Sequence, residues 1–308
     1  MNGDAGSEQS LSAAAKATPD PAAEPLPGPD LVAAAALLVS GLASFSLARG
    51  RGRRLLKRAN TPVVPPWSAS DVATMILIHL ACQVVAASLL LPQPNNPSYQ
   101  WSEATNEMVA VTTATPAVTV VWQQLAAGIL ASTLTLAVAV PLLVFRSGGW
   151  GALLFASKRP GADVAAGLLM LLAITPPLLV LAGLLNRLVP YHHPILDYLA
   201  SQQGPAALLL TLTSAVVVAP IVEEFFFRGV LQGWLERVAP AAAVPVSAAA
   251  FGLAHVDHGL GWIPLVGFGV AASLLTRRTG SLLASIVLHA GFNAIGVAAA
   301  MQHVQSAG

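Results

Sequence analysis

Residues 164–185 read VAAGLLMLLAITPPLLVLAGLL, an apolar run without a single charged side chain. About 20 residues of α-helix cross the hydrocarbon core of a bilayer, so this run is long enough to span a membrane. Its hydrophobicity is continuous, whereas the strands of a membrane barrel alternate apolar and polar residues. The run therefore predicts a transmembrane helix.

Similar runs lie on both sides of this one and extend over most of the chain. They cover residues 31–48, 72–91, 118–145, 206–235, 241–256, 262–276 and 281–300. The runs 241–256 and 262–276 are short, so each is expected to be a tilted span or a re-entrant segment. Only 9% of the residues are charged, against roughly 25% in ordinary globular proteins. The sequence thus predicts an all-α, polytopic helical membrane bundle of about eight transmembrane helices.

The ends and the charge balance exclude several other classes of protein. Residues 1–29 are rich in Ala and Pro and predict a disordered tail, without the basic and apolar regions of a cleavable signal peptide. Because the net charge is only +1, no nucleic-acid partner is expected. Cys82 is the only cysteine and lies inside a predicted span, so neither a disulfide framework nor a cysteine zinc cluster is expected.

The basic residues predict the orientation of the bundle. The stretch ARGRGRRLLKR at 48–58 directly follows the first span, and such clusters remain on the cytoplasmic side. Alternation of eight spans then places the remaining basic clusters on that same side; they consist of Arg146, Lys158, Arg159, Arg277 and Arg278. Both termini and the loop 92–117 are expected outside.

Three ionisable side chains interrupt the apolar sequence APIVEEFFFRGVLQ at 219–232. Charges are costly within a bilayer, so they usually mark a functional site. Glu224 and Arg228 are four residues apart and can pair on one helical face. Glu223 points about 100° away and has no helical partner, which makes it the candidate general base. The alternative is that these charges only extend toward the cytoplasmic interface from the end of a span.

Two later spans each carry a histidine with a partner four residues away. In AAAFGLAHVDHG, the ring of Phe251 can pack beside His255, and in SIVLHAGFNAIG, His289 and Asn293 share one face. Two donors on one face are typical of an oxyanion-binding site. Either histidine could instead be a packing residue that links two helices. His79 is interpreted as a packing residue, and Asp257 and His258 as an exposed turn.

In their order, EEFFFR, FGLAH and HAGFN match the motifs E-E-x-x-x-R, F-x-x-x-H and H-x-x-x-N. Together they resemble the CPBP family of intramembrane proteases, which includes the CAAX-processing Rce1-type enzymes and the bacterial Abi proteins. The resemblance covers about residues 205–300. With the apolar runs, this divides the chain into three parts: the tail 1–29, an N-terminal transmembrane region 30–200 and a catalytic core 201–302. The transmembrane region and the core are each expected to have about four helices.

The resemblance implies an intramembrane glutamic endopeptidase that hydrolyses a peptide or a lipid-modified protein tail. By resemblance, Glu223 and His255 activate a water, while His289 and Asn293 stabilise the oxyanion. Glu224, Arg228 and Phe251 support them. No cofactor is expected, and the site is expected to open toward the cytoplasm. The low lysine and high alanine content suggests a bacterial plasma membrane.

Three alternatives stay open at this point. Glu223, His255 and His289 have the donor types of a catalytic zinc site, which predicts a zinc-dependent membrane protease. The protein could also be a non-catalytic immunity or scaffold protein, or a transporter, although no second copy of the motif-bearing half is evident. One difficulty concerns depth, because His255 is expected about 20 Å into its span, whereas Glu223 is expected in the inner half of a long helix.

Overall fold

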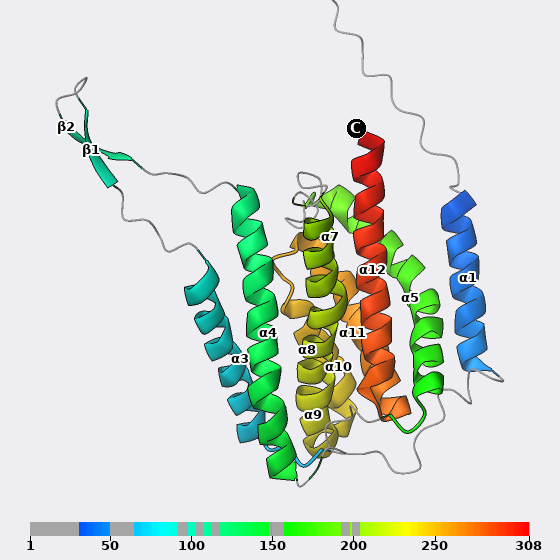
Figure 1. The fold of residues 1–308 in the computed structure, drawn as a ribbon. Helices are drawn as coiled ribbons and strands as arrows, with labels where there is room; N and C mark the ends of the chain where they lie inside the picture. The colour runs from blue at the N-terminus through cyan, green and yellow to red at the C-terminus, as the bar shows by residue number, and fades with distance from the viewer. Residues whose placement is uncertain are drawn as a thin grey trace, which may run out of the picture.

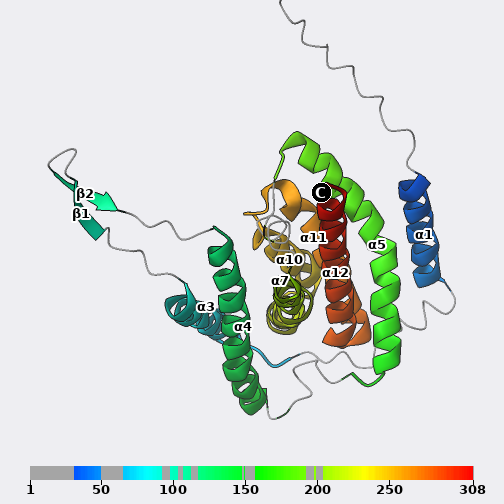
Figure 2. The same cartoon turned by 45° about the horizontal axis from the view of Figure 1, so that its top comes forward.

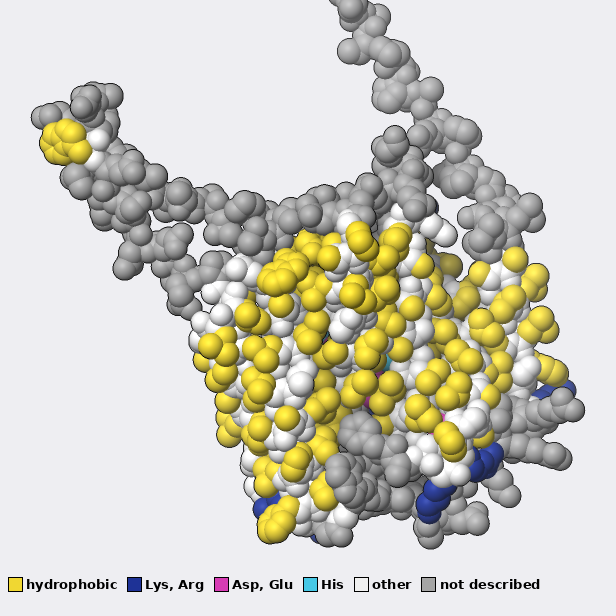
Figure 3. Space-filling view, in the orientation of Figure 1, with side chains coloured by type: hydrophobic (Ala, Val, Ile, Leu, Met, Phe, Trp, Pro, Cys, Tyr) yellow, Lys and Arg dark blue, Asp and Glu magenta, His cyan; other side chains and the backbone are white. Residues whose placement is uncertain are grey.

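The computed structural model describes residues 31–49, 65–91, 98–102, 107–111, 117–147, 149, 157–191, 198 and 204–307. The predicted tail and the basic cluster beyond Arg49 lie outside these residues. Hydrophobic side chains cover most of the described face in Figure 3. Such a surface suits helices whose solvent is lipid rather than water.

The N-terminal half contributes four helices, which are α1 (Leu31–Ala48), α3 (Ala69–Leu90), α4 (Ala117–Ser147) and α5 (Pro160–Leu188). One long helix follows, in which α7 (Pro205–Thr211), α8 (Ala219–Glu224) and α9 (Gly233–Val238) are joined by the π-helical segments η2 (Leu212–Val218) and η3 (Phe225–Gln232). The chain continues through α10 (Pro240–Leu253), the short 3₁₀ turn η4 (Gly259–Gly261), α11 (Trp262–Thr279) and α12 (Leu282–Ala307).

Six helical stretches in the described part of the chain are long and apolar enough to cross a membrane. The predicted polytopic helical bundle is therefore confirmed. The apolar stretches Ala35–Ala48 and Pro240–Leu253 are shorter, so length and composition support six of the eight predicted crossings. The predicted short span at 262–276 belongs to the longer stretch Gly259–Thr279 and is among the six.

A small β-hairpin was not expected from the sequence. Strand β1 (Ser98–Ser102) pairs antiparallel with β2 (Glu107–Val111) in the predicted outer loop. Tyr, Trp and Val favour strands, and they occur at Tyr99, Trp101, Val109 and Val111. Figure 1 shows the hairpin apart from the bundle, so the all-α description holds for the helical body alone.

The C-terminal helices occupy the middle of the bundle (Figures 1 and 2). Helices α3 and α4 flank them on one side, and α1 and α5 flank them on the other. Helix α11 packs against α10, α5 and α12. The motif-bearing helices are thus enclosed by the N-terminal half.

A proline pair bends α5, and a neighbouring helix compensates for the bond that it removes. Pro177 has no N–H to offer to the carbonyl of Ala173, four residues earlier. The hydroxyl of Ser40 on α1 donates to that carbonyl instead. In a membrane such freed backbone groups must find partners within the protein, so this bond fixes α1 against α5.

Most basic residues at the helix ends gather at one end of the body, and the exception is Arg187 in the last turn of α5. Lys and Arg side chains appear along its lower edge in Figure 3. This end carries the residues that follow α1, end α4 and α11, and precede α5: Arg49, Arg146, Lys158, Arg159, Arg277 and Arg278. The clustering agrees with the positive-inside assignment, and the cytoplasmic location of this end stays a prediction.

Candidate active site

A helical hairpin brings Glu223 and His255 to the same depth. The long helix and α10 are separated only by Ala239, whose φ of −151° and ψ of 68° leave the helical region, as is favoured before a proline. Glu223 precedes Ala239 by 16 residues and His255 follows it by 16, each about 24 Å of helical rise. The expected mismatch in depth is wrong, because the long helix extends to Val238.

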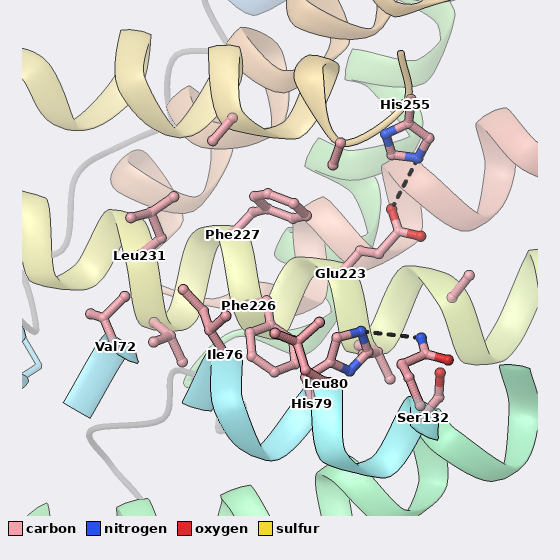
Figure 4. A pocket seen from close by; sticks show the side chains of 16 residues that line it. Val72, Ile76, His79, Leu80, Ser132, Glu223, Phe226, Phe227, Leu231 and His255 are labelled. Atoms are coloured by element: carbon pink, nitrogen blue, oxygen red, sulfur yellow. Dashed lines mark hydrogen bonds and ion pairs between the residues drawn. The ribbon is translucent and has the colours of Figure 1, made fainter. Parts of the chain in front are cut away.

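Glu223 faces two imidazoles. Its Oε2 lies 3.7 Å from His255 Nε2 and 3.9 Å from His289 Nε2. That oxygen is buried and has no hydrogen-bond partner among the described residues. Figure 4 shows the side chains of Glu223 and His255 pointing toward one another. Both separations exceed a direct hydrogen bond and suit groups that share a water.

Backbone contact fixes the orientation of His255. Its Nδ1 lies 2.8 Å from the carbonyl oxygen of Phe251, one turn earlier. Because a carbonyl only accepts, Nδ1 carries the proton and donates it. In the neutral imidazole, Nε2 is then the bare nitrogen, and it is this atom that faces Glu223.

Glu224 has a wholly different environment from its neighbour. Its side chain and that of Arg228 are fully buried, and Arg228 Nη1 lies 3.1 Å from Glu224 Oε1. This contact is an ion pair without hydrogen-bond geometry, since Arg228 Nε and Nη1 have no hydrogen-bond partner among the described residues. His289 Nδ1 lies 3.0 Å from the same Glu224 oxygen. The i, i+4 pair expected from the sequence is therefore present, with His289 as a third member.

Asn293 makes a contact that the sequence analysis did not foresee. Its Nδ2 donates to the carbonyl of Ala215, 2.7 Å away. Ala215 lies in π-helical η2, where a carbonyl normally accepts from the N–H five residues later. That residue is Pro220, which has no N–H. One amide hydrogen of Asn293 therefore stabilises α12 against the long helix rather than lying free beside His289.

Phe251 packs against every basic group of the site. Its ring centroid lies 4.9 Å from that of His255 and 5.5 Å from that of His289. The guanidinium carbon of Arg228 lies 4.5 Å from the same centroid, within the range of a cation–π contact. The contact with His255 follows from the i, i+4 spacing, whereas the other two depend on tertiary packing.

Glu223 and His255 line a cavity of about 500 Å³. One wall comes from the long helix and α10, and the other comes from α3 with Ser132 of α4. Figure 4 shows Val72 and Leu231 toward one end and Glu223, His255 and Ser132 toward the other. His79 lies on the α3 wall, across from Glu223. Sequence spacing did not indicate this position, because α3 is far from the motifs along the chain.

Residues 205–295 match the model of the Rce1-like family, described as type II CAAX prenyl endopeptidase Rce1-like. No curated protein and no solved structure matches the chain. Residues 205–295 form an Rce1-like domain. The match begins at α7, ends within α12, and contains all seven residues singled out by the sequence motifs.

A polar ladder runs along the Rce1-like domain from the site to the basic end. Polar side chains recur at every fourth position of the long helix. They face backbone carbonyls and one side chain that have the same spacing in α11. The rungs are Arg228 Nη2 with the Gly269 carbonyl at 3.4 Å, Gln232 Nε2 with the Ser273 carbonyl at 3.1 Å, and Arg277 Nη2 with Glu236 Oε2 at 3.0 Å. The period of four was visible in the sequence, but the partner helix was not.

The turn after α10 in the Rce1-like domain is more ordered than expected. Asp257 is exposed, but His258 is half-buried, with its ring 5.3 Å from that of His255 and 6.0 Å from that of Tyr191. Burial lowers the pKa of His258, although the Asp257 carboxylate acts in the opposite direction. Burial and Asp257 together raise the pKa of Tyr191. The ring of His258 thus lies between His255 in the site and Tyr191, which lies toward the end of the bundle opposite the basic end.

The zinc alternative finds no support in the arrangement of side chains. Within the described ranges, no three His, Cys, Asp or Glu side chains form a group that could hold a metal ion. Glu223, His255 and His289 have suitable donor atoms, but their arrangement is not such a group. We therefore derive no step through zinc.

Proposed function

We propose that the protein is an intramembrane endopeptidase in which Glu223 acts as general base on a hydrolytic water. The observation that carries the proposal is the buried Glu223 Oε2, which faces two imidazoles on the wall of an apolar cavity. The Rce1-like domain at residues 205–295 supports an intramembrane protease. The individual catalytic roles are our inference.

The reaction follows from the hydrogen-bonding state of each group. Glu223 takes a proton from a water that His255 orients through its bare Nε2. The resulting hydroxide forms a bond to the carbonyl carbon of the substrate, and the carbonyl electron pair moves onto oxygen. When this tetrahedral species collapses, the carbon–nitrogen bond breaks and the proton on Glu223 passes to the leaving amine. The products are a carboxylic acid and an amine, and transfer of the acid proton to the amine leaves a carboxylate and an ammonium ion.

The oxyanion is assigned to His289 and Asn293. When doubly protonated, His289 donates from Nε2 while its Nδ1 stays on Glu224. Asn293 contributes its second amide hydrogen, because the first is engaged by Ala215. Donors held in place before the reaction stabilise the developing charge without reorganisation. Glu224, Arg228 and Phe251 are positioning residues that hold His289 and His255.

The substrate is a peptide or a lipid-modified protein tail that enters from the membrane. Six apolar helices indicate an integral membrane protein. We assign the basic end to the cytoplasm by the positive-inside rule. The cavity reaches from Glu223 toward Val72, near the start of α3 at that end, which favours access from the cytoplasmic side.

The test compares two carboxylates of the same helix. The wild type, Glu223→Gln and Glu236→Gln are purified into lipid nanodiscs and offered a library of internally quenched apolar peptides. We expect Glu223→Gln to lose cleavage by at least about 10³-fold, as is usual when a group essential to the chemical step is removed. Glu236→Gln should retain it, since Glu236 lies at the basic end.

Cleavage by Glu223→Gln at the wild-type rate would overturn the assignment. Thermal unfolding and size-exclusion profiles of both variants show that a lost activity is not lost folding. Activity that survives Glu223→Gln and disappears with a zinc chelator would instead favour a metal-dependent enzyme. In cells, full complementation of a deletion by a Glu223→Gln, His255→Ala double variant would favour a non-catalytic scaffold.

A further inference from the structure

Helix α3 forms the wall of the cavity opposite Glu223. Among the α3 residues that line the cavity, the polar ones lie together at one place. His79 and Gln83 stand one turn apart there, while Val72, Ile76 and Leu80 are apolar. Figure 4 shows His79 across the cavity from Glu223 and His255. Both residues lie outside the Rce1-like match at 205–295, so the family motifs assign nothing to them.

Hydrogen bonds determine the tautomer of His79. The hydroxyl of Thr135 on α4 donates to the Ala131 carbonyl at 2.7 Å. Its oxygen therefore accepts from His79 Nδ1, 3.2 Å away. His79 Nε2 is then the bare nitrogen, and Gln83 Nε2 lies 3.3 Å from it as a donor. His79 is a neutral hydrogen-bond acceptor in this arrangement.

Packing holds the same imidazole in place. The ring of Phe226, which also lines the cavity, lies 5.0 Å from the ring of His79. Thr135, at the other side, is completely buried. Gln83, in contrast, is exposed within the described structure. The pair therefore combines a fixed acceptor with an adaptable amide.

This pair matches the hydrogen-bonding groups of a peptide backbone. A substrate N–H can replace the Gln83 amide at His79 Nε2, and the released Gln83 amide can donate to a substrate carbonyl. A free terminal carboxylate fits less well, because none of the described residues lining the cavity is Lys or Arg and one of them is Glu223. The chemistry favours a neutral, internal peptide group.

We infer that His79 and Gln83 bind a backbone peptide group of the substrate and hold the scissile bond across the cavity against Glu223 and His255. The inference rests on the proposed function and deepens it. It assigns substrate binding to the N-terminal half of the chain.

The experiment removes the hydrogen-bond donor from the substrate as well as the acceptor from the protein. Each non-scissile peptide bond of a cleaved peptide is replaced in turn by an ester, which has no N–H. The esters are tested on the wild type, His79→Ala, Gln83→Ala and Val84→Ala. Val84 is exposed and does not line the cavity, so it is the control on the same helix.

At one position the ester should raise the wild-type KM about tenfold, the usual effect of one lost hydrogen bond. The same ester should change the KM of His79→Ala by less than about twofold, because that bond is already missing. Val84→Ala should behave as the wild type. His79→Gln, which restores an acceptor, should recover part of the loss.

Two results would overturn the inference, and they are distinguishable. If Glu223-dependent cleavage is present but every ester affects the wild type and His79→Ala equally, His79 only packs and the proposed function is untouched. If no peptide is cleaved in a Glu223-dependent manner, the proposed function fails and the binding role fails with it.

Discussion

Two faces of one helix serve opposite purposes in this protein. The face toward α11 and α12 carries Glu224, Arg228 and Gln232, all of which are buried and engaged with neighbouring side chains or carbonyls. The face toward the cavity carries Glu223, whose Oε2 has no hydrogen-bond partner among the described residues. Two residues that are adjacent in the sequence therefore need not share a role. One step along the helix turns the side chain by about 100°. This turn separates the ion-paired carboxylate of Glu224 from that of Glu223, which is available for chemistry.

The largest loss of stability is expected when the Glu224–Arg228 ion pair on the buried face is broken. Arg228→Met leaves the Glu224 carboxylate buried without its arginine partner, with His289 and Ser285 still beside it, which should lower the free energy of unfolding by about 3 to 5 kcal/mol. Glu223→Gln should change that free energy by less than about 1 kcal/mol, since no such partner is lost. Denaturant titration in mixed micelles measures both. An equal loss in the two variants would contradict the contrast between the faces.

The double variant Glu224→Gln, Arg228→Met tests whether the loss comes from an unpaired buried charge. A buried ion pair that is removed as a whole costs less than one that is cut in half, because no charge is stranded. We expect the double variant to recover at least half of the loss seen in Arg228→Met. Additive losses in the double-mutant cycle would show that the two residues do not interact.

The next effect tests how closely α11 must approach α10. A Cβ at Gly269 would lie 2.9 Å from the Ala248 Cα and 3.0 Å from its carbonyl oxygen. Gly269→Ala should therefore push α10 outward and cost about 1 to 3 kcal/mol, and it should reduce peptide cleavage by moving His255. Gly296→Ala in α12 is the matched control, because nothing lies within 4 Å of its added Cβ.

Gly296→Ala should be neutral or stabilising by up to about 1 kcal/mol, as expected for alanine inside a helix. Unfolding midpoints and cleavage rates of both variants test the comparison. Gly269→Ala with wild-type stability and activity would show that the α10–α11 contact does not position His255.

A smaller effect belongs to the basic end of the ladder. Arg277 pairs with Glu236 through two nitrogens, but the two side chains are 29% and 19% exposed. Arg277→Met should cost no more than about 1 kcal/mol, and high salt should reduce the cost. Unfolding at low and high ionic strength measures it. A salt-independent loss as large as that of Arg228→Met would show that the Arg277–Glu236 pair behaves as a buried ion pair.

The sequence predicted most of what depends on local spacing. The helical bundle, the Glu224–Arg228 pair and the contact of Phe251 with His255 follow from hydrophobic runs and i, i+4 positions. The position of His79 could not be predicted, because it depends on how α3 packs against the long helix. The use of the Asn293 amide depends on a carbonyl that Pro220 leaves free in a π-helical turn, and periodicity at 3.6 residues gives no sign of it.

The smallest effect is expected at Gln232, in the middle of the ladder. Its Nε2 donates to the Ser273 carbonyl, but its Oε1 is buried and has no hydrogen-bond partner in the described structure. Gln232→Leu loses this bond and a second bond from Nε2 to Glu236 Oε1 at 3.3 Å, each worth about 1 kcal/mol, and it removes an unsatisfied oxygen that costs about 1 to 3 kcal/mol. The two terms oppose each other, so stability should stay within about 1 kcal/mol of the wild type. A loss comparable to that of Arg228→Met in the same titration would mean that Gln232 Oε1 has a partner, such as a buried water, and that the ladder is a continuous hydrogen-bonded network from the active site to the basic end.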